Sequence, residues 1–191
     1  MLTQRDIERI WFGCGNFGGI GSSPSLRAAG DSEERALQLL DHARTVGLRR
    51  FDTANTYGGG ASETVLGKWL SSQGAEFRQG AQIATKVGNP HGCPPGETPL
   101  SRAQIAHHLD ESLHRLGIER IDLYQAHRDD PDTPQEETAQ AFADLIKQGK
   151  VRAIGASNFT AARLKSALDV SKAHNLPRYE SLQPLYNLVE R

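Results

Sequence analysis

Short apolar stretches alternate along the chain with longer segments in which apolar residues recur every three or four positions. The short stretches are rich in β-branched and aromatic residues, which favour strands, whereas the longer ones have the period of an amphipathic helix. Because the two kinds alternate, the pattern predicts βα units on a parallel sheet. The six expected strands are residues 9–13, 48–53, 82–87, 121–127, 151–157 and 180–186.

Three of the longer segments carry their own start and stop signals. The segment that begins at Ser101 opens with a capping-box pair, Ser101 and Gln104. Another has Thr133 as the expected cap and Pro134 at the first helical position. Each segment ends at a glycine, as helices commonly do. The helices expected on these grounds cover residues 32–47, 101–117 and 133–149.

Polar residues stand where three successive expected strands end. Asp52 ends the second strand, Lys86 lies near the end of the third, and His127 ends the fourth. Periodicity alone leaves a barrel and a doubly wound sheet open, but in a (β/α)8 barrel the carboxyl ends of the strands converge on one mouth. No dinucleotide fingerprint follows the first strand, as a doubly wound sheet of this kind would require. We therefore predict a barrel, with Tyr57 in a loop over its mouth.

The residue types at these strand ends favour proton donation to a carbonyl oxygen. A tyrosine ordinarily has a pKa of about 10, and a nearby ammonium lowers the pKa of a phenol because it stabilises the phenolate. We assign that role to Lys86, with Asp52 holding the lysine charged and oriented, so that Tyr57 becomes the acid. A neutral His127 would hold the same oxygen. Because side chains cannot donate hydride, a nicotinamide is expected to supply it.

Composition narrows the class of protein. The chain has 191 residues, of which 37% are hydrophobic and 24% charged, so we expect one globular domain. With 22 basic and 23 acidic residues there is no charge excess that would favour nucleic acid or a membrane surface. We expect a cytoplasmic protein, because no apolar run is long enough to span a bilayer and the first residues are too polar for a signal peptide. Cys14 and Cys93 have no spacing typical of a disulfide framework or a zinc site.

Several segments together resemble the aldo-keto reductase family. They are FDTANTYGGGASETVLG at 51–67, ATK at 84–86, IDLYQAHRDD at 121–130, GKVRAIGASNF at 149–159 and QPLYNLVER at 183–191. The resemblance covers nearly the whole chain in the right order. It implies a (β/α)8 TIM barrel that uses NADPH, less often NADH, to reduce a small aldehyde or ketone.

Site residues follow from the same resemblance by position. The family's catalytic residues fall on Asp52, Tyr57, Lys86 and His127. The residues that bind the cofactor fall on Asp52, Ser157, Asn158 and Gln183. The segment GCGNFGG at 13–19 resembles the family's border between cofactor and substrate, which assigns Asn16 and Phe17 to the substrate side. No metal is implied.

Length is the departure from the family pattern. A complete barrel takes about 250 residues, whereas residues 1–191 are expected to form a single reductase domain with about six βα units, truncated before the last two. The first and sixth strands would then have free edges, through which chains are expected to self-associate. Two functions stay open: a carbonyl reductase, and a non-catalytic nucleotide-binding module similar to potassium-channel β subunits.

Structural roles compete with the functional ones at single positions. Ser157 and Asn158 together are also a credible cap for the helix that follows them. His127, taken without its partners, would be read as a core histidine. His107 and His108 are expected on the solvated flank of their helix.

Overall fold

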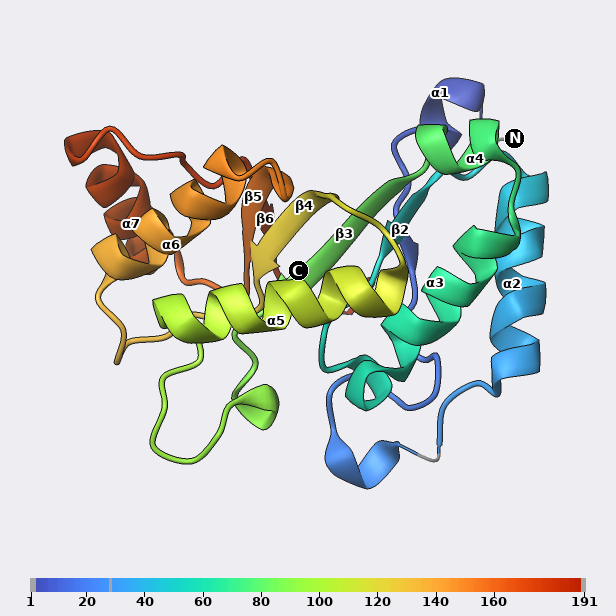
Figure 1. Cartoon of the computed structure of the whole chain (residues 1–191), viewed down its shortest axis with the longest axis horizontal. Helices are drawn as coiled ribbons and strands as arrows, with labels where there is room; N and C mark the ends of the chain where they lie inside the picture. The colour runs from blue at the N-terminus through green and yellow to red at the C-terminus, as the bar shows by residue number, and fades with distance from the viewer. Residues whose placement is uncertain (1–2, 28, 190–191) are drawn as a thin grey trace.

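Six parallel strands form one sheet in sequence order, β1-β2-β3-β4-β5-β6. The structure is a computed structural model that describes residues 3–27 and 29–189. Figure 1 shows the strands crossing the centre of the molecule. Their bounds are β1 Phe12–Gly13, β2 Arg50–Asp52, β3 Gln82–Val87, β4 Ile121–Ala126, β5 Val151–Ser157 and β6 Ser181–Gln183.

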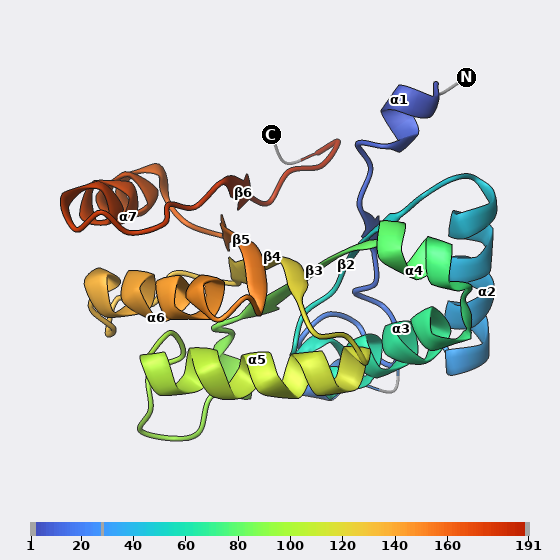
Figure 2. The same ribbon diagram turned by 45° about the horizontal axis from the view of Figure 1, so that its top comes forward.

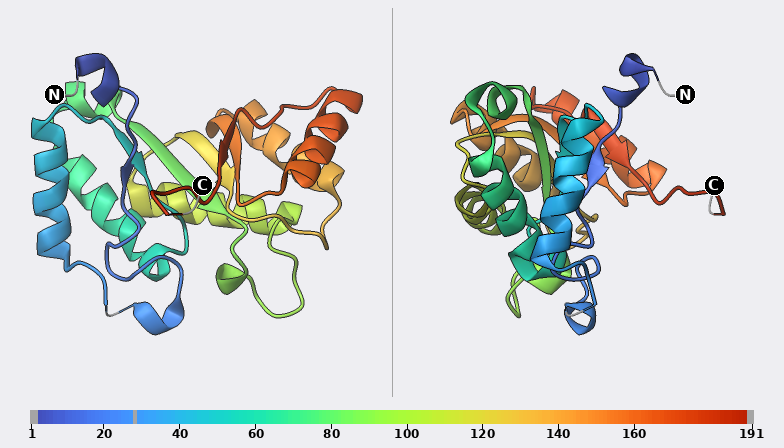
Figure 3. Two further views of the ribbon diagram at one scale, coloured as in Figure 1. Left: turned by 180° about the vertical axis from the view of Figure 1, so that it is seen from behind. Right: turned by 90° about the vertical axis from the view of Figure 1, so that its right-hand side faces the viewer.

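Helices follow the strands and cover one face of the curved sheet (Figure 2). The α-helices are α1 Gln4–Ile7, α2 Glu33–Thr45, α3 Ala61–Ser72, α4 Ala75–Gly80, α5 Arg102–Leu116, α6 Gln135–Lys147 and α7 Ala161–Ala173. Three short 3-10 turns are η1 Pro24–Leu26, η2 Tyr57–Gly60 and η3 Pro90–Gly92. Helix α1 and the segment after β6 project from the opposite side (Figure 3).

Strand order and helix placement decide between the two predicted architectures. A doubly wound sheet has helices on both faces and a reversal in its strand order, whereas this sheet keeps sequence order throughout. The arrangement is that of an incomplete TIM-barrel-type fold, as predicted. Within the described residues β1 pairs only with β2, and β6 pairs only with β5. The sheet is therefore open, with a free edge at each end.

Register brings the carboxyl ends of the strands to one edge of the sheet. Asp52 of β2 lies opposite Ala84 of β3, and Lys86 of β3 lies opposite Gln125 of β4. The last residues of these strands therefore share one edge, and side chains two positions apart point to the same face. This edge is where the candidate catalytic residues lie.

The core lies between the sheet and its helices. Phe51 of β2 packs edge-on against Trp69 of α3, with 5.1 Å between ring centroids. Tyr124 of β4 packs in the same way against Phe142 of α6, at 5.6 Å. All four side chains are buried, and each aromatic ring removes on the order of 150–250 Å² from water. These rings hold the helices on the sheet.

One predicted helix start is wrong, and one alternative cap is not used. Thr133 does not cap α6, and Ser157 and Asn158 do not cap α7. Helix α6 begins at Gln135, with Pro134 as its N-cap. The Thr133 hydroxyl donates instead to the Asp130 carboxylate, at 2.6 Å. The cap of α7 is Thr160, whose hydroxyl accepts a hydrogen bond from the Arg163 backbone N–H.

The predicted capping box of α5 is only half formed. The Ser101 hydroxyl accepts a hydrogen bond from the backbone N–H of Gln104, as expected. The Gln104 side chain, however, donates to the Glu97 carboxylate in the preceding loop.

No helix in the described residues is long and apolar enough to cross a membrane.

Candidate active site

Strand ends and one short turn position four polar side chains at the same edge of the sheet. Asp52 is the last residue of β2, Lys86 lies one residue before the end of β3, and His127 directly follows β4. Tyr57 is the first residue of η2. Lys86 is only 1% exposed, and Asp52 and His127 are also buried. The structure thus brings together the four residues to which the sequence assigns catalysis.

The Lys86 ammonium is the centre of this group. Its Nζ donates to Asp52 Oδ2 at 2.7 Å, to the Thr53 carbonyl oxygen at 2.8 Å and to Tyr57 Oη at 3.2 Å. An ammonium has three hydrogens, so these acceptors use its whole donor capacity. A buried charge is tolerated when it is paired and hydrogen-bonded in this way. The tyrosine hydroxyl is consequently held against a fixed positive charge.

His127 faces the Tyr57 ring. The two ring centroids are 5.5 Å apart and the planes meet edge to face, at 83°. Burial, with smaller contributions from the charges of Lys86 and Arg128, lowers the pKa of His127 to about 3. The imidazole is therefore neutral at physiological pH. Its Nδ1 is buried without a hydrogen-bond partner in the described part of the chain, and an unpaired lone pair is tolerated better than an unpaired N–H, so we assign the proton to Nε2.

Three glycines shape the turn that presents Tyr57. Gly58, Gly59 and Gly60 have φ values of 59°, 69° and 99°, in the left-handed region that side chains other than glycine rarely adopt. A Cβ on Gly58 would lie 2.6 Å from the carbonyl oxygen of Phe17. Glycine is needed here for both conformation and space. The turn leads directly into α3 and fixes the tyrosine over the strand ends.

Sequence reasoning missed one residue at the site, Gln125, and one buried carboxylate on the opposite, helix-covered face of the sheet, Glu63. Glu63 of α3 is fully buried, and its carboxylate accepts hydrogen bonds from the Thr85 hydroxyl at 2.5 Å and from Arg115 Nε at 2.7 Å. Gln125 of β4 donates from Nε2 to Asp52 Oδ1 at 3.4 Å. Both had a signal in the sequence, because Glu63 occupies the apolar stripe of its helix and Gln125 lies two positions before His127, on the same face of the strand.

Asn158 adopts a backbone conformation that is unusual for a residue with a side chain. Its φ is 56°, and such strain is concentrated at functional sites. Its Nδ2 donates to the His127 carbonyl oxygen at 2.9 Å and to Ser157 Oγ at 3.0 Å. Ser157 Oγ in turn donates to the Gln183 carbonyl oxygen at 2.8 Å. Three of the four residues assigned to the cofactor, Ser157, Asn158 and Gln183, are thus hydrogen-bonded to one another beside His127.

The two residues assigned to the substrate side lie in the loop after β1. Asn16 and Phe17 line an open depression that Asp52 and Tyr57 also line. Phe17 is nevertheless buried in the core, and its ring lies 6.3 Å from that of Phe12. Asn16 is the more available of the two for contact with a ligand, because it is exposed.

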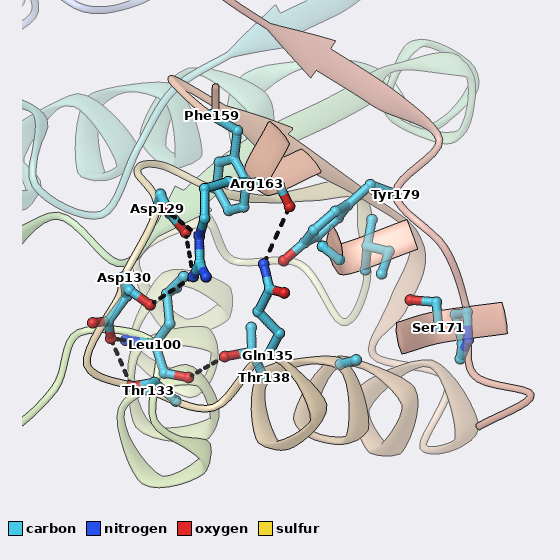
Figure 4. A pocket seen from close by; sticks show the side chains of 14 residues that line it. Leu100, Asp129, Asp130, Thr133, Gln135, Thr138, Phe159, Arg163, Ser171 and Tyr179 are labelled. Carbon is cyan, nitrogen blue, oxygen red and sulfur yellow. Dashed lines mark hydrogen bonds and ion pairs between the residues drawn. The ribbon is translucent and has the colours of Figure 1, made fainter. Parts of the chain in front are cut away.

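A separate cavity lies between α6, α7 and the loop after β4 (Figure 4). Arg163 crosses it and binds the Asp129 carboxylate through Nε at 2.7 Å and Nη2 at 2.9 Å. Gln135 Nε2 donates to the Arg163 carbonyl oxygen. The cavity volume is about 10 Å³, room for about one water molecule. Because it cannot admit an organic substrate, we interpret it as a packing region whose hydrogen bonds hold α7 against α6 and the loop after β4.

Comparison with known proteins decides the family. The model of the aldo/keto reductase family matches residues 9–191. The chain belongs to this family. Among aldo-keto reductases and their relatives it is 34% identical over 197 residues to the uncharacterized oxidoreductase YrpG of Bacillus subtilis, with 99% of this chain and 57% of that protein covered. It is 38% identical over 159 residues to a putative voltage-gated potassium channel subunit beta of Schizosaccharomyces pombe, with 83% and 46% covered.

A solved aldo-keto reductase has the same fold. The crystal structure of the thermostable aldo-keto reductase Tm1743, in complex with the inhibitor epalrestat, matches with a TM-score of 0.75 at 31% identity. The match covers 93% of this chain and 57% of that chain. This chain thus spans about half the length of the curated relatives it matches.

Aldo-keto reductases use a nicotinamide cofactor, and the polar groups near His127 fit its carboxamide. Both amide hydrogens of Asn158 are used within the protein, which leaves its Oδ1 as an acceptor that no described residue fills. A carboxamide N–H is the complementary donor. The Gln183 amide is turned inward, since its Oε1 accepts from Gln125 Nε2 at 3.2 Å. Asn158 is therefore better placed than Gln183 to accept a hydrogen bond from the carboxamide.

Proposed function

We propose that this chain carries the catalytic part of an NAD(P)H-dependent carbonyl reductase, with Tyr57 as the general acid. The observation that supports it most is the contact of the buried Lys86 ammonium with Tyr57 Oη at 3.2 Å and with Asp52 at 2.7 Å. A structural lysine has no need of a phenol as a third acceptor. NADPH is the expected cofactor, with NADH as the alternative, and the substrate is a small aldehyde or ketone.

Each side chain has a distinct part in this reaction. The cofactor supplies a hydride to the carbonyl carbon. His127, neutral because of its lowered pKa, donates a hydrogen bond to the carbonyl oxygen. Tyr57 transfers its hydroxyl proton to the same oxygen, so that the carbonyl becomes an alcohol and the tyrosine a phenolate. Lys86 compensates the phenolate charge, and Asp52 holds Lys86 in place.

A second candidate function is nucleotide sensing without catalysis. It is favoured by the potassium-channel β subunit among the relatives. Against it stands the intact group of Asp52, Tyr57, Lys86 and His127, which a sensing module does not require. A sensing module would bind NADPH without oxidising it in the presence of a reactive aldehyde.

The decisive experiment compares the wild type with Tyr57→Phe, which removes the hydroxyl and keeps the ring. NADPH binding is followed by nucleotide fluorescence and turnover by NADPH oxidation with 4-nitrobenzaldehyde. Both are measured on residues 1–191 and on a fusion that adds the remaining C-terminal part of Tm1743. We expect the variant to lose on the order of 10²–10⁴-fold in rate with unchanged binding. Retained turnover in the variant would remove Tyr57 from the acid role.

A further inference from the structure

Helix α5 carries two histidines and a glutamate at positions i, i+1 and i+4. The residues are His107, His108 and Glu111, and one ligand atom from each lies within 4.8 Å of the other two. The site is separate from the catalytic group and includes none of its residues. It opens to solvent, since the side chains of His107 and Glu111 are 63% and 41% exposed. His108, contrary to expectation, is mostly covered, with 13% of its side chain exposed.

The two ring nitrogens of His108 face two acceptors. Its Nε2 lies 3.1 Å from the Gly92 carbonyl oxygen in η3, and its Nδ1 lies 3.0 Å from Glu111 Oε2. A carbonyl oxygen can only accept, so Nε2 carries a hydrogen. In a neutral imidazole Nδ1 then presents a lone pair to a carboxylate oxygen, and the two repel. Something positive must lie between Nδ1 and the carboxylate: either a second proton or a metal ion.

Two observations favour a metal ion at this position. Metal-binding histidines almost always donate their other ring N–H to a backbone carbonyl or a carboxylate, as His108 does to Gly92. A third donor is also at hand, because His107 Nε2 lies 3.7 Å from Glu111 Oε1. A proton shared between His108 and Glu111 would not involve the His107 imidazole, whereas a metal ion would bind all three side chains. Two imidazoles and one carboxylate suit zinc and similar transition metals, whereas magnesium and calcium prefer oxygen ligands.

We propose that His107, His108 and Glu111 bind a zinc-class divalent cation, with water completing a tetrahedral site. Tetrahedral zinc separates its ligand atoms by roughly 3.4 Å, so the exposed side chains of His107 and Glu111 need to rotate inward by about 1 Å. Arg115 opposes the cation, since its Nη1 lies 3.6 Å from Glu111 Oε2. Its Nε is bound to the buried carboxylate of Glu63, which offsets that charge. The nearby Asp110 is paired with Lys150.

Occupation of this site would tie a loop to the helix beside the candidate active site. The η3 turn belongs to the loop between β3 and α5, and His108 is its contact with α5 through Gly92. A Cβ on Gly92 would lie 2.8 Å from Thr56 Cγ2, so the turn rests directly on the residue before Tyr57. The cation would fix the tautomer and position of His108 and thereby restrain the turn.

Zinc titration of residues 1–191 by isothermal calorimetry tests the proposal, with His107→Gln and Glu111→Gln as variants. The matched control is His114→Gln, which removes an exposed histidine of the same helix. His127, Cys14 and Cys93 are present in every protein, so any zinc that they bind contributes equally to all the titrations that are compared. We expect both variants to bind zinc at least about tenfold more weakly than the wild type, with the control unchanged and magnesium not bound. Tetrahedral coordination should also give cobalt(II) strong visible absorption in the wild type and the control.

Equal zinc affinity in all four proteins would overturn the proposal, as would no zinc binding by the wild type. The positive group between His108 and Glu111 would then be a proton. Because the variants change exposed side chains, we expect them to fold like the wild type, and circular dichroism checks this. Since the readout is metal affinity without nucleotide or aldehyde, its failure is independent of the proposed carbonyl reduction.

Discussion

The Lys86 ammonium lies between the Asp52 carboxylate and the Tyr57 hydroxyl, 2.7 Å from the first and 3.2 Å from the second. All three groups come from different segments, β2, η2 and β3, that register brings to one edge of the sheet. The pairing therefore ties the stability of the fold to the geometry of the proposed acid.

Asp52→Asn should destabilise the protein strongly although the two side chains have the same shape. The change leaves the Lys86 charge buried without its counter-ion, which typically costs about 3–5 kcal/mol. Urea unfolding followed by tryptophan fluorescence measures the loss. The control is Glu33→Gln, which breaks the exposed pair with Lys68 and should change the unfolding free energy little. Equal effects of the two substitutions would contradict a buried, tightly coupled pair.

His127 should make the folded state sensitive to acid. Its pKa is about 3 in the folded protein and near 6.5 when unfolded, so between these values the unfolded chain binds a proton that the folded chain does not. The unfolding free energy should fall with pH below 6.5, by up to about 1.4 kcal/mol per pH unit from this group.

His127→Gln removes that contribution and leaves all other titrations in place. The stability difference between wild type and variant, measured by urea unfolding at pH 7, 6 and 5, should shift in favour of the variant as the pH falls. The exposed His114→Gln is the control, for which the difference should stay flat. A flat difference for His127→Gln as well would mean that this imidazole becomes protonated without cost in the folded protein.

Gly58→Ala should disturb the turn that presents Tyr57. An alanine at this position would have to keep the backbone φ near 59°. Its Cβ would lie 2.6 Å from the Phe17 carbonyl oxygen. Gly117→Ala is a matched control, since its φ is 65° but a Cβ there meets no atom within 4 Å. Backbone strain alone costs roughly 1–2 kcal/mol, so the loss at Gly58 beyond that at Gly117 measures the clash. Equal thermal unfolding temperatures for the two variants would show that the loop relaxes.

The open sheet should make residues 1–191 self-associate. The edges of β1 and β6 are unpaired within the described residues, and Leu185 and Tyr186 after β6 are 72% and 70% exposed. Unpaired edges and exposed apolar side chains both favour association between chains. Light scattering over a range of protein concentrations should show a mass that rises with concentration, and Leu185→Lys should reduce the rise. A constant monomer mass would contradict this prediction.

The fold and the clustering of Asp52, Tyr57, Lys86 and His127 were predictable for a common reason. Strand periodicity fixes where a strand ends, and the end of a parallel strand fixes where its last side chain lies, as for Asp52 and His127. Local signals failed where distant residues compete for the same group. The Thr133 hydroxyl is taken by Asp130, and Ser157 and Asn158 bind β6 and His127 rather than capping α7. Burial of Glu63 depends on Arg115 and Thr85, which no local pattern connects to it.

The sequential strand order also bears on how the chain is built during synthesis. Each strand pairs with the strand that precedes it, so a newly emerged βα unit finds its partner already in place. Asp52, Tyr57, Lys86 and His127 all lie on or beside the first four strands. The charge pairing at the candidate active site can therefore assemble before β5 and β6 leave the ribosome, and the later units dock onto a site that is already set.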